Sequence, residues 1–130
     1  MYRLFTALLL LVAATTTTFA QSLLPVPSYW TNQRGSEMKI YDIDAQGNFK
    51  GVFINHAQGF ACQNTPFDLT GKSIGPYVKF IVAWKNAFAD CHSTTVWRGT
   101  VIDNAKMPTR WVLYSAGGRL RGVDLFTRQP

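Results

Sequence analysis

The sequence has few of the residues from which metal and redox sites are built. It contains two cysteines and two histidines. They form no Cys-x-x-Cys pair, and no group of histidines has the spacing of metal ligands. We therefore expect neither a metal site nor a bound cofactor.

Acidic residues are also scarce, with 7 Asp and Glu against 13 Lys and Arg and a formal net charge of +6. The basic residues are scattered along the chain, and their closest grouping is Arg119 with Arg121. Nucleic-acid-binding domains usually gather basic residues into a stripe or patch. The scatter favours an ordinary solvated surface, and we expect no nucleic-acid partner.

A long apolar run occurs only at the N-terminus. Residues 1–3 are a short basic start, residues 4–14 are mostly apolar, and Thr18 and Ala20 are small residues at the −3 and −1 positions of a cleavage site. This pattern is typical of a secretory signal peptide over residues 1–20. A membrane anchor is the alternative, but the stretch is short for a span and lacks a basic stop flank. We expect a secreted or periplasmic protein with no membrane association after cleavage.

The remaining chain, residues 21–130, suits one domain with one core. Two cysteines in an exported protein are expected to pair. Since the chain has no others, the sequence predicts a disulfide between Cys62 and Cys91.

Helical periodicity is weak throughout residues 21–130, whereas alternation of apolar and polar residues is common and turn signals recur often. The predicted strands cover residues 28–33, 36–43, 48–56, 67–72, 77–86, 92–103, 107–115 and 120–128. Eight short strands joined by short turns favour an all-β, eight-stranded antiparallel up-and-down β-barrel, because closure removes the exposed edges of a sheet. Such a barrel has room for one small ligand. A β-sandwich has a similar number of strands and is the alternative.

In each predicted strand, the face that holds tryptophan or other large apolar residues should point inward. Four tryptophans lie on this face: Trp30, Trp84, Trp97 and Trp111. Six polar residues lie there too: Asn32, Ser36, Asn55, Ser93, Thr95 and Asp124. An unpaired buried hydroxyl or amide costs about 1–3 kcal/mol, and a buried carboxylate costs more. One explanation is that the polar residues satisfy one another. The other, which we favour, is a small-molecule site, because an aromatic box with a few convergent polar groups is typical of one.

Seven segments, in order and with matching spacing, resemble the avidin and streptavidin family of biotin-binding proteins. They are WTNQRGSEMKI, GNFKGVFINHAQG, LTGK, FIVAWKN, HSTTVWRG, TRWVLY and DLFT. The cysteine-bearing segments AQGFACQNTPFDLTGK and ADCHSTTVW resemble the dimeric, rhizavidin-like branch, in which a disulfide joins two loops beside the pocket. The resemblance implies an avidin-like barrel over residues 21–130, high-affinity binding of biotin without catalysis, and a homodimer.

The resemblance also implies roles for the polar residues that would surround the ureido group of biotin. Asn32 and Ser36 would donate hydrogen bonds to the ureido oxygen. Asn55 would accept from one ureido N–H, and Asp124 would accept from the other. Hydrogen bonds of this charge-assisted kind are the strong ones.

The other implied site residues would surround the rings and the tail. Trp84, Trp97 and Trp111 would form the aromatic box around the bicyclic ring. Thr95 would approach the thioether sulfur, and Ser93 would lie at the carboxylate end, near the mouth.

Two features depart from the family pattern. The family usually has a tyrosine on the third strand whose hydroxyl completes the donors to the ureido oxygen, and this chain has Phe53 there. Loss of such a donor costs about 1.5–3 kcal/mol, so we expect an affinity below that of the tightest members. Tetrameric members also insert a tryptophan into the neighbouring subunit from the loop before the last strand. Residues 116–122 contain none, which favours a dimer.

Two other functions fit parts of the sequence. A lipocalin-like carrier of another small ligand would have a mainly apolar interior, which Asn32, Asn55 and Asp124 contradict. A secreted hydrolase would need His56 or His92 with Asp124 and a serine as a nucleophilic triad. However, His92 has the parity opposite that of the neighbouring serine, and the sequence has no nucleophile elbow. We therefore expect no enzymatic activity.

Overall fold

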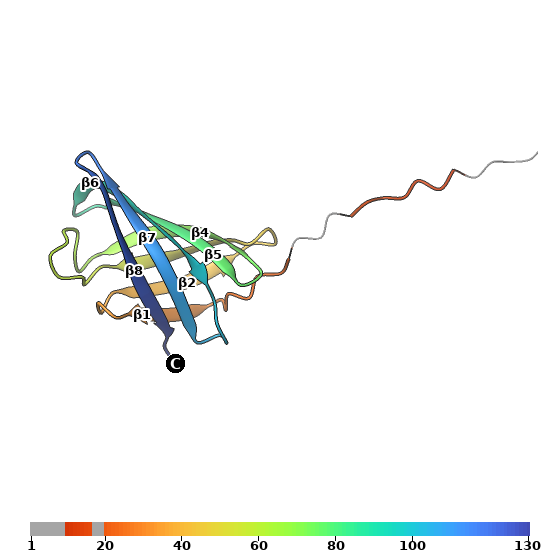
Figure 1. Cartoon of the computed structure of the whole chain (residues 1–130), viewed down its shortest axis with the longest axis horizontal. Helices are drawn as coiled ribbons and strands as arrows, with labels where there is room; N and C mark the ends of the chain where they lie inside the picture. The colour runs from red at the N-terminus through yellow and green to blue at the C-terminus, as the bar shows by residue number, and fades with distance from the viewer. Residues whose placement is uncertain (1–9, 17–19) are drawn as a thin grey trace, which may run out of the picture.

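Eight strands follow one another along the chain and close into an antiparallel barrel (Figure 1). They are β1 (Ser28–Asn32), β2 (Glu37–Ile43), β3 (Asn48–Ile54), β4 (Pro66–Ile74), β5 (Tyr77–Lys85), β6 (Asp90–Thr100), β7 (Lys106–Ser115) and β8 (Gly118–Arg128). This computed structural model describes residues 10–16 and 20–130. Each strand pairs with the next, and β8 pairs with β1. The closed barrel confirms the predicted architecture and excludes the sandwich.

The β7–β8 hairpin turns more tightly than predicted. We expected a turn over residues 116–119, but the structure pairs Ser115 with Gly118, so that only residues 116–117 separate the strands. Gly118 has a φ of 120°, a conformation that glycine adopts without steric cost. β8 therefore begins earlier than the sequence pattern indicated.

Burial follows the parity that holds the tryptophans, which confirms the predicted inward face. Trp30, Trp84, Trp97 and Trp111 are all buried. At the end of the barrel where β1 begins and β8 ends, apolar residues fill the interior. Among them are Trp30, Phe49, Val78, Met107 and Phe126. Phe80 stacks on Trp97, with ring centroids 5.0 Å apart and an interplanar angle of 14°. Because aromatic and aliphatic side chains close this end, any cavity has to lie toward the other one.

The connections β1–β2, β3–β4, β5–β6 and β7–β8 lie together at that other end, on the left of Figure 1. The longest is the β3–β4 loop, residues 55–65, which begins two residues earlier than predicted because β3 ends at Ile54. Cys62 in this loop forms a disulfide with Cys91 of β6, which confirms the predicted bridge. The bridge closes a separation of 29 positions, and a loop of that size stabilises the fold by about 3.5 kcal/mol in the chain-entropy model.

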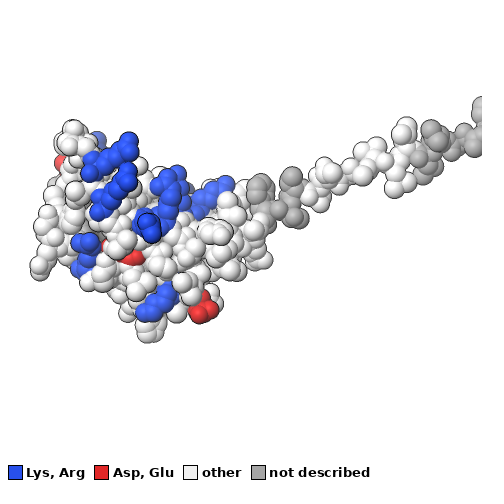
Figure 2. Space-filling view, viewed as in Figure 1, with Lys and Arg blue, Asp and Glu red and all other residues white. Residues whose placement is uncertain are grey.

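The outer surface carries basic side chains that are spread out rather than gathered in a stripe. Figure 2 shows Lys and Arg over several parts of one face, with few acidic side chains between them. Within the ranges 10–16 and 20–130, no helix is long and apolar enough to cross a membrane. The predicted signal peptide, residues 1–20, lies mostly outside the described residues and stays a prediction.

Candidate functional site

A cavity of about 240 Å³ opens between the four connections at the loop end of the barrel. All ten residues predicted for the site line it: Asn32, Ser36, Phe53, Asn55, Trp84, Ser93, Thr95, Trp97, Trp111 and Asp124. Eight of them belong to β1, β3, β5, β6, β7 and β8, while Ser36 directly precedes β2 and Asn55 directly follows β3. The structure therefore brings together, around one cavity, side chains that are far apart in the sequence.

Aromatic rings form the inner end of the cavity. The ring centroid of Phe53 lies 5.7 Å from that of Trp84 and 5.0 Å from that of Trp97. The two tryptophans are 6.3 Å apart in an edge-to-face arrangement. Such pairs each contribute about 0.5–1.5 kcal/mol beyond the burial of their area, which makes this box rigid before any ligand enters. Trp30, the fourth tryptophan, lies in the core and does not line the cavity.

Trp111 extends the aromatic lining onto β7, where it is the cross-strand partner of Trp97. A glycine makes room for its ring. Trp111 is the cross-strand neighbour of Gly122 on β8. A Cβ atom at Gly122 would lie 2.2 Å from Cζ2 of the indole. The outer edge of Trp111 meets Phe60 of the β3–β4 loop, with centroids 6.1 Å apart. Neither Gly122 nor Phe60 was among the predicted site residues.

The amide groups of Asn32 and Asn55 are oriented by backbone hydrogen bonds. Oδ1 of Asn32 accepts from the backbone N–H groups of Arg34 and Ser36, each at 3.0 Å. Nδ2 of Asn55 donates to the carbonyl of Ala61 at 3.1 Å. Since an amide has one accepting and one donating end, Asn32 is left to present its nitrogen to the cavity. Oδ1 of Asn55 accepts from the backbone N–H of Ala57 at 3.0 Å and has one further lone pair for a neighbour or a ligand.

Ser36 and Asn55 also contact each other. The hydroxyl of Ser36 accepts from the backbone N–H of His56 at 2.9 Å and lies 3.4 Å from Oδ1 of Asn55. Because its acceptor side is used by the backbone, the hydroxyl has a proton to give to a neighbour or a ligand. Asn32, Ser36 and Asn55 thus form one small group of donors and an acceptor, where β1 ends, β2 begins and β3 ends.

The carboxylate of Asp124 accepts three hydrogen bonds, and its side chain is 4% exposed. Its Oδ2 accepts from Nε1 of Trp97 at 2.9 Å. Its Oδ1 accepts from Nε2 of Gln33 at 3.0 Å and from Nε of Arg34 at 3.2 Å. Gln33 is itself fixed by the backbone N–H of Leu125, which donates to its Oε1 at 2.8 Å. Neither Gln33 nor Arg34 was among the predicted site residues.

The hydroxyls on β6 differ in their surroundings. Thr95 is buried, and its Oγ1 accepts from Nε1 of Trp84 at 2.8 Å. Ser93 is half-buried nearer the mouth, where Ser115 also lines the cavity. Some of the six polar residues therefore bond to neighbouring residues, which is the other explanation for their inward position. The hydroxyl-bearing residues Ser93 and Thr95 nevertheless line the cavity.

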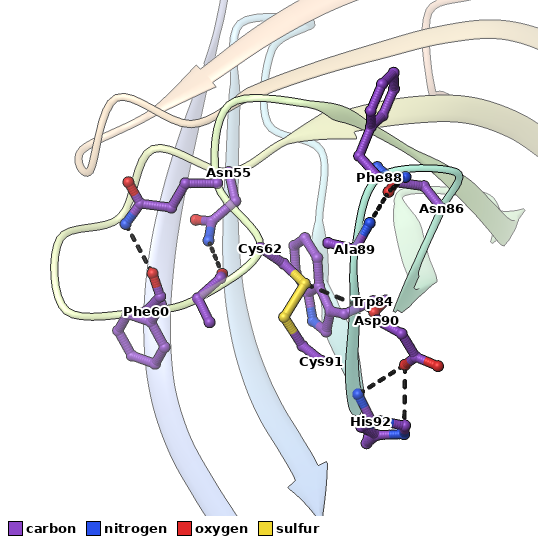
Figure 3. The surroundings of a disulfide bond; sticks show 12 residues. Asn55, Phe60, Cys62, Trp84, Asn86, Phe88, Ala89, Asp90, Cys91 and His92 are labelled. Carbon is purple, nitrogen blue, oxygen red and sulfur yellow. Dashed lines mark hydrogen bonds and ion pairs between the residues drawn. A yellow bond between two sulfur atoms is a disulfide. The ribbon is translucent and has the colours of Figure 1, made fainter.

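The β3–β4 loop is anchored beside the aromatic box. Figure 3 shows the Cys62–Cys91 disulfide next to Trp84, with Asn55 bonded across the same loop. Gln63 adds a hydrogen bond from its Nε2 to the carbonyl of Phe60 at 2.8 Å. Cys91 lines the cavity itself, so the disulfide forms part of its wall. The β3–β4 loop is therefore held in place by the disulfide and by the hydrogen bonds of the Asn55 and Gln63 amides.

A second anchor of the β3–β4 loop is ionisable. Nε2 of His56 lies 3.0 Å from Oε2 of Glu37, and its Nδ1 lies 2.9 Å from Oδ1 of Asn64. The hydrogen bond to Glu37, followed by that to Asn64, raises the pKa of His56 above its usual 6.5. Hydrogen bonds from Tyr29 and then His56 lower the pKa of Glu37 below its usual 4.5. At pH values between the lowered pKa of Glu37 and the raised pKa of His56, both side chains are charged, and the ion pair joins β2 to the loop.

The two histidines do not complete a catalytic triad in the structure. His56 lies outside the cavity lining, and its ring is bonded to Glu37 and Asn64. The side chain of His92 is 84% exposed and lies 3.6 Å from Asp90. Among the residues that the structure describes, no group of three or more His, Cys, Asp and Glu side chains is placed to hold a metal ion.

We expect the stabilisation by His56 to decrease as pH rises. A raised folded-state pKa means that the contribution is complete below about pH 6.5 and is lost as pH passes the folded pKa. Thermal unfolding of the wild type and His56→Gln should therefore show the largest difference in Tm at about pH 5.5–6 and a smaller one at about pH 9. Glu37→Gln should remove this pH dependence, because Glu37 is the main cause of the shift. A difference that grows with pH would contradict the assignment.

The sequence matches a family model and several curated relatives, afifavidin and hoefavidin among them. The model, described as the Avidin family, matches residues 21–128. Afifavidin from Afifella pfennigii is 38% identical over 109 residues, which cover 78% of this chain and 68% of afifavidin. Hoefavidin from Hoeflea phototrophica is 36% identical over 90 residues, which cover 59% of this chain and 51% of hoefavidin. The chain thus spans about half of hoefavidin and about two thirds of afifavidin.

The barrel also superimposes on solved structures. The crystal structure of a rhizavidin–biotin complex matches with a TM-score of 0.75 and 38% sequence identity, over 82% of this chain and 93% of the rhizavidin chain. Both the sequence and the fold therefore match over nearly all of residues 21–128. On these grounds the chain belongs to the avidin family.

Proposed function

We propose that this protein binds biotin, without catalysis, in the cavity at the loop end of the barrel. The observation that carries the proposal is the convergence of all ten predicted residues on one cavity with an aromatic box and oriented polar groups. The rhizavidin structure that matches this chain is a complex with biotin. A preformed, largely apolar box lowers the cost of ordering on binding, which favours high affinity.

The amide orientations support a specific mode of recognition for the ureido group. The nitrogen of Asn32 and the hydroxyl of Ser36 would donate to the ureido oxygen, since the accepting sides of both groups are used by the backbone. Oδ1 of Asn55 and Oδ2 of Asp124 would accept from the two ureido N–H groups. The second of these bonds is charge-assisted, because the acceptor is a carboxylate.

The remaining parts of biotin would occupy the aromatic box and the mouth. The bicyclic ring would lie against Trp84, Trp97 and Trp111, which all line the cavity. Thr95, at the inner end, would approach the thioether sulfur. The aliphatic tail would pass Ser93 toward the solvent, beside the disulfide loop.

We also propose that the protein is exported and has no nucleic-acid partner. Export agrees with the signal-like N-terminus and with the Cys62–Cys91 disulfide, since disulfides persist in oxidising compartments. The spread of basic side chains over the surface supports the absence of a nucleic-acid stripe. The location of His56 and His92 outside the cavity supports binding rather than hydrolysis.

A homodimer is our proposal for the assembly. Apolar side chains of β7 and β8 are exposed on the outside of the barrel, including Tyr114, Val123 and Leu125. Such side chains often mark a protein–protein contact. The β7–β8 turn, residues 116–117, carries no tryptophan that would reach a neighbouring cavity, which favours a dimer over a tetramer.

We expect titration of residues 21–130 with biotin to change tryptophan fluorescence until one biotin is bound per chain. The change should occur because three of the four tryptophans line the cavity. It should persist after dialysis, as expected for slow dissociation.

The variant Asp124→Asn should weaken biotin binding roughly 10- to 150-fold, because it loses a hydrogen bond to a charged group. The control Asp68→Asn, on the exposed face of β4, should have no effect. An unchanged tryptophan fluorescence of the wild type on addition of biotin would refute the proposed binding.

Replacement of Phe53 by tyrosine should tighten biotin binding roughly 10- to 150-fold, because a hydroxyl would add a donor near the ureido oxygen. Phe53 is 2% exposed and lines the cavity. The measurement is the dissociation rate of biotin in competition with a labelled conjugate. Phe88→Tyr is the matched control, since Phe88 is 79% exposed and outside the cavity. Equal rates for the wild type and Phe53→Tyr would show that the missing hydroxyl does not limit affinity.

The dimer is tested by the mass of the protein in non-denaturing buffer. We expect twice the mass of one chain for residues 21–130, both with and without biotin. A mass of four chains, or of one chain at micromolar concentration, would contradict a dimer. Val123→Glu should shift the mass toward one chain, because it places a charge on the exposed apolar face of β8.

A further inference from the structure

Arg34 lies at the mouth of the cavity and is held there by three elements of the barrel. Its Nε donates to Oδ1 of Asp124 at 3.2 Å. Its guanidinium carbon lies 5.8 Å from the ring centroid of Phe60 and 5.8 Å from that of Trp111. These contacts join the β1–β2 turn to the β3–β4 loop, to β7 and to β8.

The position of the guanidinium is therefore specific although its side chain is 37% exposed. A free surface arginine would sample many rotamers and its charge would be screened by water. Here an aromatic ring on each of two elements and a buried carboxylate hold the charge over the opening. Cations are attracted to the faces of aromatic rings at such distances. The positive charge thus belongs to the cavity wall.

Arg34 balances the charge of the cavity. Among the lining residues that the structure describes, Arg34 and Asp124 are the only charged ones. Their charges have opposite signs, so the lining is neutral as a whole. Without Arg34, Asp124 would leave one uncompensated negative charge in a largely aromatic site. Such a charge would attract any cation small enough to enter.

The hydrogen bonds of Asp124 lead to the same conclusion. An ionised carboxylate offers about four acceptor positions. Three are used by Nε1 of Trp97, Nε2 of Gln33 and Nε of Arg34. About one position, on the oxygen that Trp97 binds, is left for a ligand. Asp124 is thus prepared to accept one N–H group rather than to pair with a full positive charge.

We propose that Arg34 is a specificity-determining residue of the site: by pairing with Asp124 it makes the cavity select a neutral N–H donor and reject a cationic one. This inference rests on the proposed binding of biotin. A urea carries N–H groups without net charge, so Arg34 does not oppose it. A protonated cyclic guanidine has a similar shape and the same two ring N–H groups, with a further N–H donor in place of the urea oxygen. Beyond the loss of that acceptor, its positive charge would be repelled by the guanidinium held nearby. The fixed arginine therefore supplies the repulsive element on which discrimination between similar ligands depends.

The test compares biotin with 2-iminobiotin, in which a basic cyclic guanidine replaces the neutral urea. Both ligands have the same tail, so the ratio of their dissociation constants reports the head group alone. In Arg34→Met the ratio of the 2-iminobiotin constant to the biotin constant, measured by competition at about pH 7, should fall by about tenfold or more. Methionine keeps an unbranched apolar side chain over Phe60 and Trp111 but removes the charge.

Arg119→Met is the matched control. Arg119 lies near the β7–β8 turn, with its guanidinium 5.4 Å from the ring of Tyr114, and does not line the cavity. It loses the same charge and a similar aromatic contact, so its ratio should equal that of the wild type. An equal fall in both variants would overturn the proposal, since it would reflect the net charge of the protein.

The outcome also separates this inference from the function on which it rests. A wild type that binds biotin, together with an unchanged ratio in Arg34→Met, would overturn the role of Arg34 alone. A wild type that binds neither ligand would overturn the proposed function itself. Biotin binding by Arg34→Met serves as the check that the variant is folded.

Discussion

The pairing of β8 with β1 is the contact on which both the barrel and its cavity depend. It places Phe126 opposite Asn32 and so brings Asp124 to the turn that follows β1. There Gln33 and Arg34 bind one oxygen of the carboxylate, while Trp97 binds the other. A buried carboxylate without partners is strongly destabilising. Closure therefore removes the exposed sheet edges and at the same time supplies the partners that allow a charge inside the barrel.

The interior is divided between stability and binding. Apolar side chains fill the closed end, where burial contributes about 25 cal/mol per Å² of apolar surface. At the open end, polar groups replace some of this apolar area. Their cost is limited because, among the described residues, each buried side-chain nitrogen and oxygen has a hydrogen-bond partner. Thr95 accepts from Trp84, for example, and Asn55 donates to the β3–β4 loop. The same bonds that offset burial also orient the groups, so a ligand meets donors and acceptors that are already in place.

Two anchors of different chemistry hold the β3–β4 loop over the cavity. The Cys62–Cys91 disulfide ties it covalently to β6, next to the aromatic box. The His56–Glu37 pair ties its first turn to β2, and depends on pH because both pKa values are shifted by the contact. Phe60 adds a third contact by meeting Trp111 and Arg34. The longest connection of the barrel is therefore part of the site rather than a loose surface loop.

The sequence by itself determined the strands, the inward face, the disulfide and ten of the residues that line the cavity, because alternation has a period of two and the family segments occur in order. It did not reveal the roles of Arg34, Gly122 or Phe60. Arg34 and Phe60 lie in connections where no alternation applies, and Gly122 has no side chain to signal its contact with Trp111. Their roles depend on barrel closure, which places the β1–β2 turn against β8 and the β3–β4 loop against β7. Only the tertiary structure decided that the charge of Asp124 is balanced at the mouth of the cavity.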